Sequence, residues 1–78
     1  MRPLKQMNGV ELFENLRNEI AENKIKHVQM LLGLYQGKLA IHFTGLDNET
    51  FKAKVKAIAD KYSLKLVKQG KSTETYIF

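Results

Sequence analysis

The chain of 78 residues contains no cysteine, no tryptophan and only one proline. Because cysteine is absent, neither a disulfide bond nor a thiolate metal site can stabilise the fold. No run of about 18 apolar residues occurs, so no segment is predicted to cross a membrane. The first seven residues have one basic flank but no apolar segment, which does not fit a signal peptide. These features predict a cytosolic location.

What is present is typical of one small globular domain. Hydrophobic residues make up 44% of the chain. A chain of this length buries only about 60–65% of its unfolded surface, so we expect modest stability or added stability from self-association. The sequence predicts a short N-terminal arm at residues 1–7 and a single domain at residues 8–78.

Catalytic and ligand-binding signatures are missing. Neither Ser63 nor Ser72 lies in a Gly-x-Ser-x-Gly setting, and no glycine-rich phosphate loop occurs. The predicted strands place His27 and His42 about 13 Å apart, too far to bind one metal ion. We therefore expect no enzyme activity, no metal, no cofactor and no small-molecule substrate.

A first helix is predicted from Asn8 to about Asn23. Asn8 is a favourable N-cap residue, and Glu11 three positions later completes a capping-box pattern. One helical stripe is apolar and consists of Val10, Phe13, Leu16 and Ile20. This stripe predicts the face that packs on the rest of the domain.

Alternating residues at 25–35 and 38–44 predict a first hairpin. A two-residue loop at Gln36-Gly37 pairs only apolar residues on one face: Leu34 with Leu39, Leu32 with Ile41, and Met30 with Phe43. The other face then carries His27, Gln29, Leu31, Tyr35, Ala40 and His42. Glutamine is a poor first residue for a type I′ turn, so the hydrophobic pattern decides this register.

A second helix and a second hairpin follow. Asp47 is the predicted N-cap, and the apolar stripe consists of Phe51, Val55, Ile58 and Tyr62. The strands at 64–68 and 72–78 turn about Gln69-Gly70, which places Lys65 opposite Glu74. The inward face of this hairpin stays open between two sets, Leu64, Leu66 and Ile77, or Val67, Tyr76 and Phe78.

The two halves resemble each other. Residues 11–24 align with residues 49–62, and a Gln-Gly-Lys turn follows in both halves. The sequence therefore predicts an α+β fold in α-β-β-α-β-β order, with an internal pseudo-repeat of units 8–44 and 46–78. A two-layer sandwich, with both helices on one face of a four-stranded antiparallel sheet, buries both apolar stripes. The order of the two hairpins in the sheet stays open.

This order of elements resembles that of one LAGLIDADG-type endonuclease unit. The first predicted helix, from Glu11 to Ile20, lacks the glycine-rich helix ending in aspartate that those nucleases use at their metal site. The resemblance is one of topology, and it implies no functional residue in this chain.

Positive charge is concentrated in the second half. Residues 1–47 carry six Lys or Arg and five Asp or Glu, a net charge of +1, whereas residues 48–78 carry seven Lys and three Asp or Glu, a net charge of +4. A basic surface next to Tyr35 or Tyr76 could bind a nucleic-acid backbone and stack a base. The candidate residues are Lys52, Lys56, Lys65, Lys68 and Lys71.

The leading hypothesis is a protein-interaction module that forms a homodimer or binds another protein. The sheet face away from the helices is half apolar, more than a solvated face requires. The candidate interface residues are Leu31, Tyr35, His42, Tyr76 and Phe78. Nucleic-acid binding is the alternative function.

Overall fold

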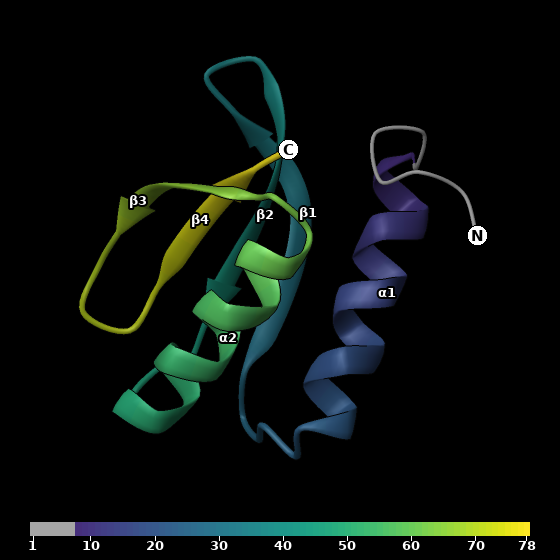
Figure 1. Ribbon diagram of the computed structural model, residues 1–78. Helices are drawn as coiled ribbons and strands as arrows, with labels where there is room; N and C mark the ends of the chain where they lie inside the picture. Colours follow the sequence, from purple (N-terminus) through teal and green to yellow (C-terminus); the bar gives the residue numbers. More distant parts are fainter. Residues whose placement is uncertain (1–7) are drawn as a thin grey trace.

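The computed structural model describes residues 8–78, so the predicted arm at 1–7 lies outside the described residues. The elements are α1 (Gly9–Glu22), β1 (Gln29–Tyr35), β2 (Lys38–Thr44), α2 (Glu49–Lys61), β3 (Lys65–Gln69) and β4 (Glu74–Ile77). The strands form one antiparallel sheet in the order β1-β2-β4-β3, and both helices lie on one face of it (Figure 1). The predicted α+β fold is confirmed. Neither helix of this part of the chain is long and apolar enough to span a bilayer.

The helices begin at asparagine caps. The Asn8 side chain accepts a hydrogen bond of 2.7 Å from the backbone N–H of Glu11, as predicted. The second cap is Asn48, whose Oδ1 accepts from the N–H groups of Thr50 and Phe51 at 2.8 and 3.3 Å. The prediction of Asp47 was therefore wrong by one residue: Asp47 and Asn48 are both favourable cap residues, and the side chain that accepts from the first free N–H groups is that of Asn48.

Both helices end in the same way. Lys24 and Ser63 follow the C-caps and have φ angles of 57° and 59°. The next residues, Ile25 and Leu64, are buried, and their N–H groups donate back to the carbonyls of Ile20 and Ala59. This is a Schellman motif, in which a left-handed residue ends the helix and an apolar residue covers its last turn.

These shared ends set the correspondence between the halves. Leu16 matches Val55 and Ile25 matches Leu64, so corresponding residues of the two helices and their ends are 39 positions apart (55 − 16 and 64 − 25). The sequence alignment used a separation of 38 and set Leu16 against Lys54. The structural match is the better one, because it pairs buried residues with buried residues.

The first hairpin has the predicted register. Leu34 lies opposite Leu39, Leu32 opposite Ile41, and Met30 opposite Phe43. Gln36 and Gly37 have φ angles of 50° and 79°, which is the left-handed conformation that a type I′ turn requires at both positions. The apolar pairs therefore outweigh the poor turn propensity of glutamine.

The second hairpin differs from the prediction. Glu74 lies opposite Gln69, and Lys65 lies opposite Ile77. The ladder is irregular between Leu66 and Lys68, which leaves Val67 as the extra residue of a bulge. The loop spans residues 70–73 and is closed by a 2.8 Å hydrogen bond from Gly70 N–H to the Thr73 carbonyl. The predicted Lys65–Glu74 pair is wrong because the longer loop and the bulge shift the register.

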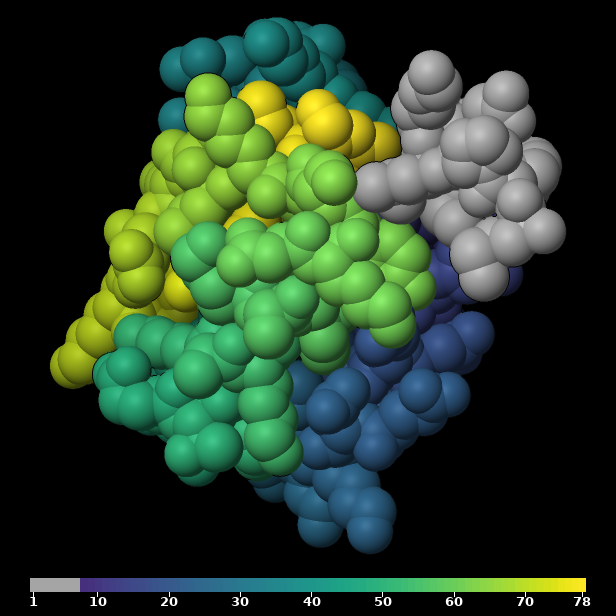
Figure 2. Space-filling model, viewed as in Figure 1, coloured from purple at the N-terminus to yellow at the C-terminus, as the bar shows by residue number. Residues whose placement is uncertain are grey.

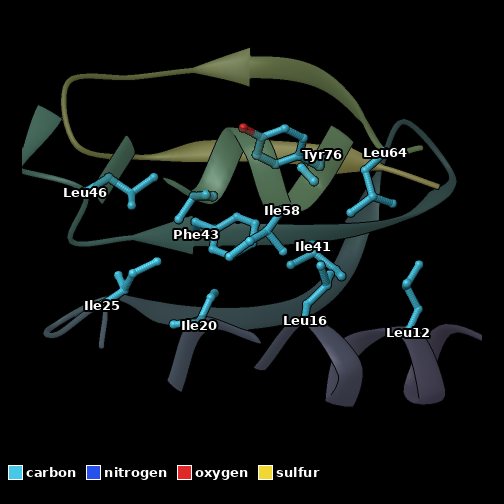
Figure 3. Packing of buried hydrophobic residues seen from close by; sticks show 12 residues of the cluster. Leu12, Leu16, Ile20, Ile25, Ile41, Phe43, Leu46, Ile58, Leu64 and Tyr76 are labelled. Carbon is cyan, nitrogen blue, oxygen red and sulfur yellow. The ribbon is translucent and has the colours of Figure 1, made fainter. Parts of the chain in front are cut away.

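The core lies between the helices and the sheet. Leu12, Leu16 and Ile20 point from α1 toward the sheet, where the rings of Phe43 and Tyr76 meet edge to face with centroids 5.7 Å apart (Figure 3). Tyr76 has an exposed fraction of 0%. Its assignment to an interface is therefore wrong, since the observed register turns this ring toward the helices.

A buried polar pair lies in this same layer. The Tyr76 hydroxyl donates a 2.7 Å hydrogen bond to Oε1 of Glu74, which is only 3% exposed. The Gln69 side-chain amide lies 3.4 Å from the other carboxylate oxygen. Burial, together with this bond to Glu74, raises the pKa of Tyr76. The hydroxyl therefore stays protonated and keeps the carboxylate hydrogen-bonded inside the core.

Candidate binding surfaces

The open face, the side of the sheet away from the helices, is built from two cross-strand rows. The first row consists of Leu31, His42, Thr75 and Lys68, which lie opposite one another in successive strands. The second row consists of Gly33, Ala40, Ile77 and Lys65. Tyr35 and Lys38 form a further pair beside the β1–β2 turn. Three of the five predicted interface residues, Leu31, Tyr35 and His42, therefore share this face.

The His42 ring is fixed on the open face by both of its nitrogens. Nδ1 lies 2.9 Å from Thr75 Oγ1, and Nε2 lies 3.3 Å from the Leu34 carbonyl oxygen. Because a carbonyl only accepts, Nε2–H donates to Leu34 and the Thr75 hydroxyl donates to Nδ1. A Cβ atom at Gly33 would lie 3.3 Å from this ring. Glycine at this position thus lets the His42 ring lie close over β1.

The lysines divide between the two layers. Lys38, Lys65 and Lys68 are exposed on the open face. On the helix side, Lys56 forms a 3.1 Å ion pair with Asp60. There, Lys52 donates a 2.9 Å hydrogen bond to the Lys71 carbonyl and lies 3.7 Å from Glu49. The structure thus separates Lys65 and Lys68 from the other three predicted nucleic-acid residues.

Two other predicted positions lie away from the open face. Phe78 follows β4 on the helix side, near the start of α1, where its ring would lie 3.3 Å from a Cβ atom at Gly9. His27 was expected on the open face, but it precedes β1 and has a φ angle of 64°. This left-handed residue belongs to the loop that turns the chain from α1 into the sheet, so the alternation of a strand does not apply to it.

The two edge strands have opposite character. β1 reads Gln-Met-Leu-Leu-Gly-Leu-Tyr and contains no charged residue and no proline. Its Leu31 and Leu34 are 65% and 67% exposed. β3 carries Lys65 and Lys68 and the bulge, which are common devices that keep an edge strand from pairing. Within residues 8–78, β1 is therefore the edge without such protection.

A groove lies beside the β1 edge. It has a volume of about 310 Å³ and is lined by Phe13, Arg17, Ile20, Val28 and Met30, so it runs between α1 and the start of β1. The walls are apolar except for the exposed Arg17, which forms no ion pair within the described part of the chain. The hairpin tip above it extends past β4 and β3 (Figures 1 and 2).

Sequence reasoning missed three features of these surfaces. Leu34 was assigned to the packed face, and its pairing with Leu39 was correct. Its side chain is nevertheless exposed, because the end of the hairpin extends beyond the part of the sheet that the helices cover. Lys38 was not among the candidate lysines, although its pairing with Tyr35 follows from the predicted register. The Arg17 groove had no sequence signal, because it depends on the angle between α1 and β1.

Comparisons with known proteins give no further information. No protein family, no curated protein and no solved structure matches this chain. Among residues 8–78, no three histidine, aspartate or glutamate side chains converge in a way that could hold a metal ion. The function must therefore be argued from the surfaces themselves.

Proposed function

We propose that this chain is a non-catalytic protein-interaction module that forms a homodimer through β1. The main observation behind this proposal is that the β1 edge strand has no charged residue and that about two thirds of the surface of Leu31 and of Leu34 is exposed. A long, flat and apolar edge strand readily pairs with another strand, and a second copy of the chain offers the same neutral strand. The cytosolic location expected from the sequence stays a prediction.

The backbone favours one register for this pairing. Tyr35 and Lys38 flank the two-residue turn and so exchange hydrogen bonds, and every second residue of β1 does the same with β2. Met30, Leu32 and Leu34 therefore direct their N–H and C=O groups toward the free edge, where the Leu34 carbonyl also accepts the hydrogen bond from His42 Nε2. An antiparallel pair with its two-fold axis at Leu32 places Met30 opposite the partner's Leu34, and it uses all three of these residues.

The same register fills the groove. Met30 lines the groove, so the partner's Leu34 opposite to it enters the apolar space between α1 and β1. By symmetry this contact forms twice, and in each copy it removes from water Leu34, the most exposed leucine within residues 8–78. Burial of one leucine side chain is worth roughly 1.5–3 kcal/mol.

Charge argues against the alternative in which two open faces meet. Each open face carries Lys38, Lys65 and Lys68, and a face-to-face dimer would bring both sets together. Like charges in an interface oppose association. The neutral β1 strand is therefore the favoured contact between two copies.

The experiment is a sedimentation series on the wild type and on Leu34→Lys. We expect a wild-type dimer at about 100 µM and a monomer for Leu34→Lys, because the lysine would enter an apolar groove. Since Leu34 is exposed in the single chain, its replacement should leave the circular dichroism spectrum and the unfolding midpoint of the monomer unchanged.

The matched control is Ala57→Lys, which adds the same charge on the outer side of α2, at an exposed position. This variant should remain as dimeric as the wild type. A wild type that sediments as a monomer throughout the series would refute the proposal. So would a Leu34→Lys variant that dimerises as well as Ala57→Lys does.

A further inference from the structure

We infer that the open face binds single-stranded nucleic acid, with Lys38, Lys65 and Lys68 on the phosphates and the rings of Tyr35 and His42 against the bases. This surface is separate from the β1 edge and the groove, and the inference does not depend on dimerisation. It differs from the lysine set expected from the sequence, because three lysines of that set, Lys52, Lys56 and Lys71, lie away from this face.

The open face has positive charge and no carboxylate. Seven of the eight acidic residues lie on the helices or next to them: Glu11, Glu14, Glu19, Glu22, Asp47, Glu49 and Asp60. The eighth, Glu74, is buried on the helix side beside Tyr76. The three lysines of the open face form no ion pair within residues 8–78, so their ammonium groups are free to bind an anion.

The face is also prepared for stacking. Bonds at both nitrogens hold the His42 imidazole close over Gly33, so the ring is fixed before any ligand arrives. Tyr35 lies two residues beyond Gly33 on the same face of the same strand. Base stacking on flat rings is worth about 1–3 kcal/mol per base, whereas an acidic protein surface would gain little from them.

The arrangement of charge and rings favours a single strand over other anions. The two β3 lysines each end a cross-strand row, and Lys38 lies next to Tyr35, so cations border the surface that carries the rings. Four-stranded sheets with aromatic residues on a bare face bind unpaired bases in this way, with phosphates held at the border. The positive charge at the border and the rings between the lysines together favour a nucleic-acid strand as the ligand of this face.

The test is fluorescence anisotropy with labelled oligo(dT) and oligo(rU) of about 12 nucleotides. Lys65→Gln/Lys68→Gln is compared with the control Lys54→Gln/Lys56→Gln, which removes the same charge from α2. We expect at least tenfold weaker binding for the β3 pair and a change of less than threefold for the α2 pair. Between about 50 and 200 mM salt, the log–log slope should fall by about 1.4 for the β3 pair, since two phosphate contacts are lost.

A second variant separates stacking from charge. Tyr35→Ala should weaken oligonucleotide binding by about 5- to 150-fold, the ratio equivalent to one lost stacked base. It should not change the binding of polyglutamate, which has charge but no bases. Equal losses for both β3 and α2 pairs, or an oligonucleotide affinity that Tyr35→Ala leaves unchanged, would overturn the inference. Tighter binding of polyglutamate than of either oligonucleotide would assign the face to an acidic protein instead.

Discussion

The two halves of the molecule share their framework and differ at their surfaces. Residues 8–46 and 48–78 each begin a helix at asparagine, end it in a Schellman motif and continue into a hairpin. The first half then presents a neutral edge strand, and the second half presents an edge with two lysines and a bulge. The shared features build the fold, so a function is best sought where the halves differ.

The sheet order gives this comparison a geometric basis. In the order β1-β2-β4-β3, each hairpin contributes one inner and one edge strand, and the inner strands β2 and β4 run antiparallel. Exchange of the two hairpins therefore leaves the order unchanged. Phe43 and Tyr76 hold equivalent positions in the two hairpins: Phe43 lies opposite Met30, and Tyr76 lies opposite Leu66. Their rings contact each other where the two halves meet.

The largest expected effect is at this junction. Phe43→Ala removes a ring that is almost fully buried and should destabilise the chain by about 3–5 kcal/mol. For so small a domain this is comparable to its whole free energy of unfolding. Urea unfolding measures the loss, with Leu39→Ala in the same strand as a control that should cost much less because Leu39 is exposed. Similar losses for both variants would contradict the placement of the core.

The second prediction concerns the polar exception in the core. Two residues before Phe43 the first half has Ile41, whereas two residues before Tyr76 the second half has Glu74. Tyr76→Phe removes the hydroxyl that donates to the buried carboxylate and should cost about 1–3 kcal/mol. The double variant Glu74→Leu/Tyr76→Phe makes the second half resemble the first, and it should recover most of that loss, because both polar partners are then gone.

A double-mutant cycle in urea provides the measurement for this pair. The expected coupling between the two positions lies between about 0.5 and 3 kcal/mol. Additive effects would mean that Glu74 and Tyr76 are stabilised independently and that the hydrogen bond contributes nothing.

The sequence predicted the first half better than the second for a physical reason. Three apolar pairs on one face fix the register of the first hairpin, and a one-residue shift would turn the apolar residues of one strand to the opposite face. In the second hairpin both faces carry apolar residues, and Glu74 faces inward, so the alternation could not select a face. The four-residue loop and the bulge at Val67 then shifted the register, so the pairing predicted from a two-residue turn at Gln69-Gly70 was wrong.

The candidate surfaces follow the same division. Leu31, Tyr35 and His42 could be placed together because alternation alone puts them on one side of the first hairpin. Tyr76 was misplaced because its side depended on the register of the second hairpin. Lys52 and Lys56 were grouped with the strand lysines by charge, although carboxylates three or four residues away on the same helix pair with them. Such local pairs can be recognised in a sequence from their spacing.

The third prediction tests the shared helix ends. Lys24 and Ser63 both adopt the left-handed conformation, which favours glycine. Lys24→Gly and Ser63→Gly should each stabilise the chain by about 0.5–1 kcal/mol, since the strain of a side chain at positive φ is relieved. Thermal unfolding compares the two, and Asp60→Gly within α2 serves as a control that should destabilise by a similar amount. A gain in one half only would show that the two ends are not equivalent.

The smallest expected effect lies where the helices meet. Glu19 of α1 forms a 2.7 Å ion pair with Lys61 of α2, and hydrogen bonds from Lys61 and Tyr62 lower the pKa of Glu19. Burial, together with the bond to Glu19, raises the pKa of Tyr62 to about 12. The acidic first helix and the basic second helix thus attract each other at one defined contact.

Because the pKa of Glu19 is lower in the folded chain, its ionised form contributes stability at neutral pH, and this contribution disappears as the pH falls from the ordinary value of 4.5 through the folded value. Glu19→Gln should therefore cost about 0.2–1 kcal/mol at neutral pH and almost nothing in strong acid. Urea midpoints measured across this range give the difference from the wild type. Glu14→Gln, on the exposed side of α1, should give no such pH dependence. If Glu19→Gln destabilised the chain equally in acid, the ionised Glu19–Lys61 pair would not be the source of the lost stability. Packing rather than charge would then hold the two helices together at this contact.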